Sequence, residues 1–192
     1  MPADIATRYN QSMTEWMKEL IVLVEAEFHS KRIVGSLATV ETDGTPRSRM
    51  VIVRSFNESD NTLWITTDSR SDKMPQLEKQ PSAELVFWLL NERQQFRLRG
   101  LVRIVRNGSA RQELWNGLND SSRAMFFWPM PGAVRVAGSE FVKAVAPGPA
   151  PKEFVLLVLK PEVVEALELN ESPHRRRRWS EAGGWRMELL NP

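Results

Sequence analysis

The sequence of 192 residues contains no cysteine and only two histidines, His29 and His174. The absence of cysteine excludes disulfides, thiol nucleophiles and cysteine-ligated zinc or iron–sulfur sites. A hydrolase with a histidine base is a poor interpretation, because neither histidine lies in a nucleophile motif. We expect no metal site, and any redox chemistry in this chain needs a bound cofactor.

The chain also lacks an excess of one charge and any long hydrophobic run. Its 26 Lys and Arg residues face 24 Asp and Glu residues, so no general basic field favours nucleic acid. The stretch "MPADIATRYNQSMTEWMKEL" at the start has acidic residues and no apolar core of signal-peptide length, and no later run reaches about 18 apolar residues. These features predict a cytoplasmic protein with no membrane partner.

What is present is a chain of the length of one domain, spanning residues 1–192. Apolar residues at spacings of three and four predict an amphipathic helix over residues 11–28. The stripe consists of Met13, Trp16, Met17, Leu20, Val24 and Phe28.

Runs rich in β-branched and aromatic residues, bounded by turn signals, predict a β-rich remainder. Five consecutive strands are expected at 33–40, 48–56, 62–67, 83–90 and 94–105, with a short helix over 71–79. Two short helices follow within 109–127, and β segments are then expected over about 153–190, at 153–160, 163–169, 175–179 and 185–190. This order predicts an α+β protein with an antiparallel split β-barrel and flanking helices, rather than a doubly wound sheet.

The stretch "TTDSRSDK" at residues 66–73 joins a strand end to a helix start. Backbone N–H groups at a helix start and the side chains of Arg70, Ser71 and Lys73 are groups that bind a phosphate monoester. The alternative is that Ser71 is an ordinary N-cap and that both cations are solvated.

Two further stretches carry polar side chains on predicted strands. In "RSRMVIVR", residues 47–54, alternation places Arg49 on one face with Val51 and Val53, so Arg49 invites an anionic partner unless it is a solvated arginine at a sheet edge. In "ERQQFRLRG", residues 92–100, Gln95 and Arg97 share a face. An amide there can read the edge of a heteroaromatic ring, although a solvated strand has the same pattern.

These three stretches, in this order and with the join "LEKQPSAELVFW" between them, resemble the pyridoxamine 5'-phosphate oxidase-related, FMN-binding split-barrel proteins, and in particular the branch with the strand-end motif R-S-x-K. The resemblance runs from about residue 33 to residue 100, with weaker echoes to the C-terminal "LLNP". It implies that FMN is the cofactor.

The resemblance assigns roles to particular residues. Arg49 takes the place of the arginine that grips the FMN phosphate, and Lys73 matches a lysine on the same phosphate. Asp72 stands where the family has an arginine, which leaves Arg70 or Ser71 to supply the missing contact. The residues expected along or beside the flavin are Met50, Val51, Ile52, Arg54, Thr66 and Thr67.

The resemblance also covers the flavin ring and the substrate. Gln95 matches the glutamine that approaches the isoalloxazine, with Gln94 as the alternative register. In "PHRRRRW", His174 and Arg176 match residues that neighbour the flavin and orient substrate or assist proton transfer. The run 175–178 can instead be read as a basic nucleic-acid patch, although strand alternation would split it between two faces.

The substrate phosphate site of the true oxidase is less well kept. Its basic position survives as Arg54, whereas its tyrosine, arginine and serine correspond to Trp115, Asn119 and Arg123. The leading hypothesis is therefore an FMN-dependent oxidoreductase that acts on an unassigned small molecule and forms a homodimer with FMN at the interface. The alternatives are a non-catalytic flavin- or ligand-binding split barrel and a nucleic-acid-binding barrel.

Overall fold

The computed structural model describes residues 13–29 and 32–192. The first helix, α1, spans Glu15–Phe28, so the part of the predicted helix that precedes Met13 lies outside the described residues. The remaining elements are β1 Ile33–Val40, β2 Pro46–Asn57, β3 Thr62–Asp68, α2 Lys73–Lys79, β4 Ser82–Leu89, β5 Gln94–Val105, α3 Ser109–Asn116, α4 Asp120–Ala124, a 3-10 turn Met125–Phe127, β6 Phe154–Glu168, β7 Arg175–Ser180 and β8 Glu188–Leu190.

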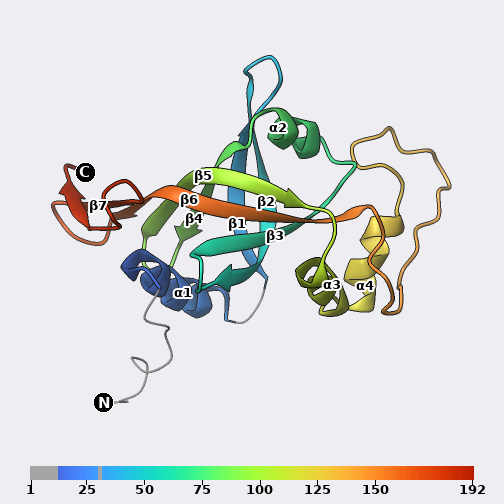
Figure 1. Cartoon of the computed structure of the whole chain (residues 1–192), viewed down its shortest axis with the longest axis horizontal. Coiled ribbons are helices and arrows are strands. Elements are labelled where there is room, and N and C mark those ends of the chain that lie inside the picture. Colours follow the sequence, from blue (N-terminus) through green and yellow to red (C-terminus); the bar gives the residue numbers. More distant parts are fainter. Residues whose placement is uncertain (1–12, 30–31) are drawn as a thin grey trace.

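The strands form one antiparallel sheet in the order β3-β2-β1-β4-β5-β6-β7-β8. An additional pairing of β3 with β6 closes the first six of these strands into a barrel (Figure 1). The first half of β6 pairs with β3, and its second half pairs with β7, so β7 and β8 extend away from the barrel. The predicted α+β class with an antiparallel split barrel and flanking helices is confirmed.

Strand β6 is continuous, whereas the sequence predicted two strands interrupted at residues 161–162. Proline lacks the N–H that a sheet ladder uses and therefore favours a strand end. In the structure Pro161 lies opposite Gly100 at a β-bulge, where the register of β5 against β6 shifts. A Cβ atom on Gly100 would lie 2.0 Å from the carbonyl oxygen of Lys160, so the close approach of the two strands requires glycine.

The core fills the barrel and continues under α1. Residues on the predicted helical stripe, including Trp16, Leu20 and Val24, are fully buried against it. A second cluster packs the outer side of β6 against α3 and α4, and consists of Trp115, Leu118, Phe126 and Phe154. Both faces of the first half of β6 are therefore covered, which agrees with its run of apolar residues.

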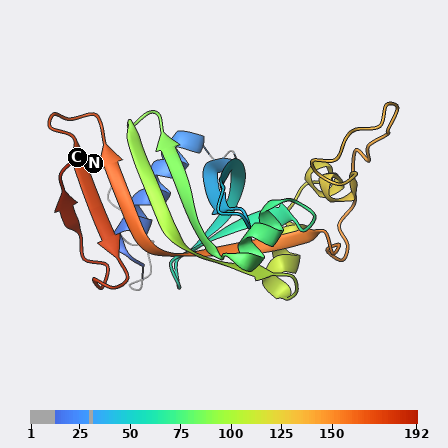
Figure 2. The same cartoon turned by 90° about the horizontal axis from the view of Figure 1, so that it is seen from above.

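A long segment between the 3-10 turn and β6 contains no helix or strand. Figure 2 shows it extending from the end of the molecule opposite β7. Within the ranges that the structure describes, no helix has the length and apolar character needed to cross a membrane.

Candidate functional site

A pocket of about 400 Å³ lies where β2, the end of β1 and the start of α2 meet. Three cationic side chains and two carboxylates contribute to its lining, together with a buried amide and a short piece of the long segment. The lining residues are Glu41, Arg47, Ser48, Arg49, Ser71, Asp72, Lys73, Gln76, Pro131 and Gly132. Three of the predicted cofactor-binding residues, Arg49, Ser71 and Lys73, are thus brought together.

Arg49 lies on the core-facing side of β2, as the alternation with Val51 and Val53 predicted. It is two residues before the first buried residue of the strand, Val51, and is itself half-buried. Strand β2 is not a sheet edge, because it pairs with β1 on one side and β3 on the other. One guanidinium nitrogen donates to the Leu37 carbonyl at 3.2 Å and another to Oε1 of Gln76 at 2.9 Å. Burial lowers the pKa of Arg49 from its ordinary value.

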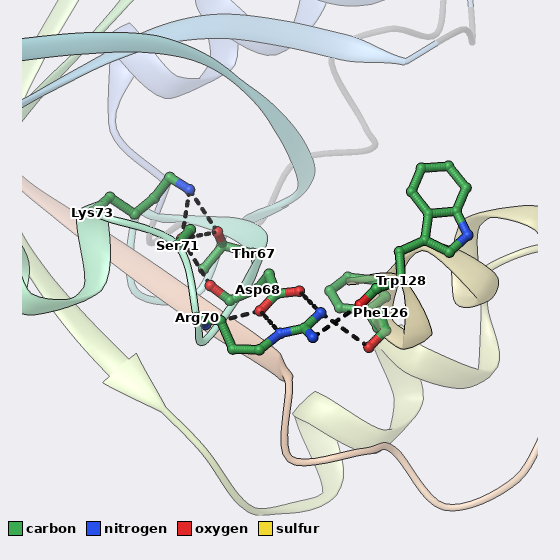
Figure 3. A network of polar contacts seen from close by, with 7 residues as sticks. All are labelled: Thr67, Asp68, Arg70, Ser71, Lys73, Phe126 and Trp128. Carbon is green, nitrogen blue, oxygen red and sulfur yellow. Dashed lines mark hydrogen bonds and ion pairs between the residues drawn. The ribbon is translucent and has the colours of Figure 1, made fainter. Parts of the chain in front are cut away.

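The strand end at β3 supplies the second half of the pocket. Lys73 Nζ donates to Thr67 Oγ1 and to Ser71 Oγ, at 2.9 Å in each case (Figure 3). Ser71 Oγ in turn donates to the Asp68 carbonyl at 2.8 Å, and the N-cap position of α2 is Asp72. The interpretation of Ser71 as the N-cap is therefore wrong. The pKa of Lys73 is lowered first by burial and second by the positive charge of Arg49.

These residues fit a phosphate group. Arg49 and Lys73 are partly buried cations, and the charge of Arg49 lowers the pKa of Lys73, so an anion bound beside them would relieve that repulsion. The unused guanidinium protons of Arg49 and the third ammonium proton of Lys73 are donors for phosphate oxygens, while Ser71 Oγ accepts from Lys73 and holds its ammonium group at the pocket. The pocket is therefore suited to the phosphate end of a nucleotide-like ligand.

Arg70 does not line this pocket. Its guanidinium forms an ion pair with Asp68, with NH2 2.7 Å from Oδ2, and donates to the main-chain carbonyl of Trp128 at 2.9 Å (Figure 3). Asp72, which stands where the family has an arginine, does line the pocket. Arg47 contributes the third cation, and its Nε donates to Glu41 Oε1 at 3.1 Å.

The other residues predicted beside the flavin divide between the two faces of the barrel wall. Val51 and Thr67 point inward and are buried, whereas Met50 points outward and is 65% exposed. Thr66 also points outward, and its Oγ1 accepts from Arg54 Nε at 3.0 Å.

Arg54 and Ile52 line a separate pocket of about 420 Å³ between β2 and the turn that joins α3 to α4. Arg32, Asn119 and Ser122 also line it. The pKa of Arg54 is lowered by burial and then by the positive charge of Arg32. This second pocket is therefore also suited to an anion.

Two residues at the positions of the oxidase's substrate site are withdrawn from that second pocket. Trp115 is fully buried in the second core cluster. Arg123 is buried, pairs with Asp120, and donates to main-chain carbonyls that include those of Val145 and Leu118. Only Asn119 of the three lines the pocket, and its side chain accepts from the Ser122 N–H as the N-cap of α4.

Gln95 and Arg176 lie together on another part of the surface. Gln95 on β5 pairs with Leu167 on β6, which pairs with Arg176 on β7. Gln94 points inward, is buried, and donates to Glu19 of α1 at 3.1 Å. His174 is exposed in the turn before β7. In both overall views β7 lies at one end of the molecule, away from α2, so one chain does not bring these residues to the pocket of Arg49 (Figures 1 and 2).

The four arginines of β7 alternate between faces, as the sequence predicted. Arg177 points inward to Glu19 and Glu168, whereas its neighbours Arg176 and Arg178 point outward. Arg176 NH2 lies 2.6 Å from Glu165 Oε2, and Arg178 NH2 lies 2.7 Å from Glu188 Oε2. The basic run is thus paired with carboxylates of neighbouring elements.

Sequence reasoning missed several residues of the pocket. Gln76 is 1% exposed and joins Arg49 to Glu41, to which its Nε2 donates at 2.8 Å. Its position three residues after Lys73, on one face of a short helix, was a usable signal. Pro131 and Gly132 carried none, because "WPMPG" indicated only the end of a helix. Among the described residues, no group of three or more His, Asp or Glu is placed to hold a metal ion.

Comparisons with known proteins identify the family. The family model described as "Pyridoxamine 5'-phosphate oxidase, FMN-binding domain" matches residues 13–106. Pyridoxine/pyridoxamine 5'-phosphate oxidase 2 of Arabidopsis thaliana is 31% identical over 165 residues, which cover 80% of this chain and 83% of the plant protein. The pyridoxine/pyridoxamine 5'-phosphate oxidase of Rhizobium etli is 34% identical over 96 residues, which cover 50% of this chain and 44% of that protein.

Solved structures extend the likeness to nearly the whole chain. A pyridoxamine 5'-phosphate oxidase-related, FMN-binding protein from Nostoc punctiforme matches with a TM-score of 0.84 and 32% identity, covering 94% of this chain and 100% of that one. PhzG from Burkholderia lata, solved with tetrahydrophenazine-1-carboxylic acid, shares the fold with a TM-score of 0.72 and 22% identity, covering 92% and 89%.

The fold and these matches define the class as an FMN-binding split barrel. The chain belongs to the pyridoxamine 5'-phosphate oxidase-related family, whose cofactor is FMN.

Proposed function

We propose that the protein is an FMN-dependent oxidoreductase whose cofactor phosphate binds in the pocket of Arg49, Ser71 and Lys73. The observation that carries this proposal is the convergence of two partly buried cations and a hydroxyl, from β2 and from the turn and helix that follow β3, on one pocket of a chain in an FMN-binding family. Bound FMN supplies two-electron transfer at its isoalloxazine ring.

The residues of the chain bind the FMN phosphate and orient the flavin. Arg49 and Lys73 neutralise the phosphate, Ser71 orients the Lys73 ammonium group through the hydrogen bond that its Oγ accepts, and Gln76 holds the Arg49 guanidinium in position. We assign the outer side of β2, with Met50 and Ile52, to the flavin, together with Arg54 and Thr66 on the same surface. Val51 and Thr67 support this wall from inside the barrel.

We further propose that two copies of the chain share each site. Gln95, His174 and Arg176 do not reach the phosphate pocket of their own chain, so a second copy must supply them if they act on the same flavin. Exposed apolar side chains on the outer barrel wall, Met50 and Trp88 among them, support burial of this surface in a dimer. In this arrangement Gln95 orients the ring, while His174 and Arg176 orient substrate or move a proton.

The substrate is a small molecule with an anionic group that faces Arg54 and Arg32. Their pocket retains two arginines that pair with no carboxylate in the described part of the chain. The withdrawal of Trp115 and Arg123 into the core favours a second candidate function, a flavin-binding split barrel that does not oxidise pyridoxamine 5'-phosphate. We propose no nucleic-acid partner, because the arginines of β7 are engaged by carboxylates.

The test has two stages. Purified protein should carry, or take up when FMN is added, a flavin with a visible spectrum distinct from that of free FMN. Protein that takes up no FMN would contradict the proposal. Under anaerobic conditions, bleaching of the bound flavin by pyridoxamine 5'-phosphate would identify the oxidase activity. Bleaching by another anionic reductant alone would keep the oxidoreductase and change its substrate, and no bleaching by any of them would favour the non-catalytic binder.

A further inference from the structure

Arg70 is engaged on both sides of its guanidinium. Its Nε and NH2 donate to Oδ1 and Oδ2 of Asp68 at 3.0 and 2.7 Å, a two-point contact, and its own backbone N–H donates to Oδ1 at 2.8 Å. NH1 donates to the carbonyl of Trp128 at 2.9 Å, and NH2 reaches that of Phe126 at 3.4 Å (Figure 3). The side chain therefore connects the end of β3 with a segment more than 50 residues further along the chain.

One side of this connection belongs to the phosphate pocket. The Asp68 carbonyl accepts from the N–H and the Oγ of Ser71, at 3.1 and 2.8 Å, and Ser71 Oγ accepts from Lys73. Asp68 therefore holds Ser71 through its main chain and Arg70 through its carboxylate.

The other side leads to the same pocket. The segment that begins at Phe126 and Trp128 continues to Pro131 and Gly132, which line the same pocket as Lys73. Arg70 thus lies between two walls of one cavity without lining the cavity itself.

The segment needs such an anchor. Residues 128–138 are exposed and contain no helix or strand, and Val134 is 95% exposed. Its contacts are mostly local: Trp128 Nε1 donates to the Val142 carbonyl at 2.7 Å, the rings of Trp128 and Phe141 pack together, and Arg135 lies over the Phe141 ring. The N–H groups of Ala133 and Ser139 close two tight turns within the segment. A segment whose contacts are mostly local depends on its fixed end for its position.

We propose that Arg70 is a positioning residue for the FMN phosphate site. It fixes residues 126–132 against the end of β3 so that Pro131 and Gly132 close the pocket, and it does not contact the phosphate. This inference rests on the proposed binding of FMN in that pocket. It replaces the expectation from the sequence that Arg70 supplies the phosphate contact missing at Asp72.

A lysine at position 70 distinguishes the role of phosphate ligand from the role of positioning residue. A phosphate ligand needs mainly a positive charge, which Arg70→Lys retains. The bridge needs a planar fork that binds a carboxylate at two points while it donates to two carbonyls, and a lysine does not provide that geometry. Arg70→Lys should therefore behave like Arg70→Ala if Arg70 positions the segment.

The experiment compares Arg70→Ala, Arg70→Lys, Arg49→Ala and the exposed control Arg103→Ala. The first readout is limited trypsin digestion of FMN-free protein, with mass detection of the fragment 136–192 produced by cleavage after Arg135. We expect both Arg70 variants to speed this cleavage at least ~10-fold, because hydrogen bonds from a charged donor are lost, while Arg49→Ala and Arg103→Ala leave it unchanged. The second readout is FMN affinity, which both Arg70 variants should weaken to a similar extent.

Unchanged cleavage in both Arg70 variants would overturn the proposal, as would Arg70→Lys binding FMN like the unaltered protein while Arg70→Ala does not. A thermal melt of each variant shows that it is folded, and Arg70→Lys stands in if Arg70→Ala is not. Because the digestion is done without FMN, its result stays separate from the proposed function: a protein that binds no FMN contradicts that function, and the cleavage rates still decide whether Arg70 anchors the segment.

Discussion

Arg49 and Lys73 are the two residues whose charges bear most directly on the proposed phosphate site. Arg49 lies on β2 and Lys73 begins α2, both are partly buried, and neither forms an ion pair with a carboxylate in the described part of the chain. Their alternation and spacing were readable in the sequence. The role of Arg70 was not readable in the sequence, because nothing there indicates that its guanidinium binds Asp68 and the carbonyls of Phe126 and Trp128.

Replacement of both cations should weaken FMN binding strongly. We expect Arg49→Ala with Lys73→Met to cost about 3–6 kcal/mol of binding free energy, since each charge-assisted hydrogen bond is worth roughly 1.5–3 kcal/mol. Fluorescence titration of FMN measures this loss. Arg103→Ala, an exposed arginine outside the pocket, serves as the control and should bind normally. An unchanged affinity in the double variant would reject the site.

The same pair gives a pH dependence. The pKa of Lys73 in the FMN-free protein lies below its ordinary value of 10.5, because of burial and the charge of Arg49. As pH rises through that lowered pKa, the free protein loses the proton that phosphate binding requires, so FMN affinity should fall at alkaline pH. The Lys73→Met variant should lack this part of the fall, and the comparison cancels the titration of FMN itself. Identical profiles in both proteins would contradict the assignment.

Gly100 tests the bulge that keeps β6 continuous. An alanine Cβ would lie 2.0 Å from the Lys160 carbonyl oxygen and 2.7 Å from Pro161 Cα, so Gly100→Ala should destabilise the protein by at least ~2 kcal/mol. Gly117→Ala is the matched control, because its Cβ would meet nothing closer than 3.6 Å. Urea denaturation measures both, and equal stability of the two variants would show that the strands separate there without cost.

At the scale of elements, the positions of most strands followed from the sequence because they depend on local alternation and turns. The differences from the sequence predictions have non-local causes. A strand end was predicted at residue 160, but β5 supplies a glycine opposite Pro161 and the strand continues. The alternative interpretation of Ser71 as a helix cap fails because its hydroxyl donates to Asp68 instead. Neither partner is visible from the neighbouring sequence.

Arg177 of β7 forms an ion pair with α1. Arg177 is 8% exposed as a side chain, and its NH2 lies 2.5 Å from Glu19 of α1 and 2.7 Å from Glu168 of β6. Arg177→Met removes the cation and leaves two partly buried carboxylates, so we expect a loss of about 3 kcal/mol in unfolding free energy.

Arg178→Ala provides the control for that prediction on the same strand. Arg178 points to the opposite face and pairs with Glu188, and both side chains are well exposed, so its loss should cost at most about 1 kcal/mol. Chemical denaturation of the two variants measures the difference. A loss at Arg178 as large as at Arg177 would show that the basic run acts as one surface rather than as two faces.

At the scale of the whole molecule, every described strand belongs to one sheet, which supports the proposal of a single domain. The residues assigned to FMN nevertheless fall into two groups on that sheet. Arg49, Ser71 and Lys73 lie at the end of the barrel near α2, and Gln95 and Arg176 lie on the extension formed by β5, β6 and β7. One FMN can use both groups only across two copies of the chain.

Mixed dimers test this arrangement. One variant carries Arg49→Ala and Lys73→Met, and the other carries Gln95→Ala and Arg176→Ala, so each alone should bind FMN weakly at both sites. In a mixed dimer, purified with two different tags, one site collects all four substitutions and the other collects none. We therefore expect about one tightly bound FMN per mixed dimer, because binding at the intact site uses the same contacts as in the unaltered protein.

Partnering the Arg49 and Lys73 variant with the Arg103→Ala control gives the reference, because that mixed dimer contains a complete site in either arrangement. If each site were built from one chain, the first mixture would show no tight site while the reference still showed one. A protein that stays monomeric when loaded with FMN would contradict the shared site directly. If two variants that each bind FMN weakly form a mixed dimer with one tight FMN site, Gln95 and Arg176 of one chain act on the FMN whose phosphate is bound by the other chain.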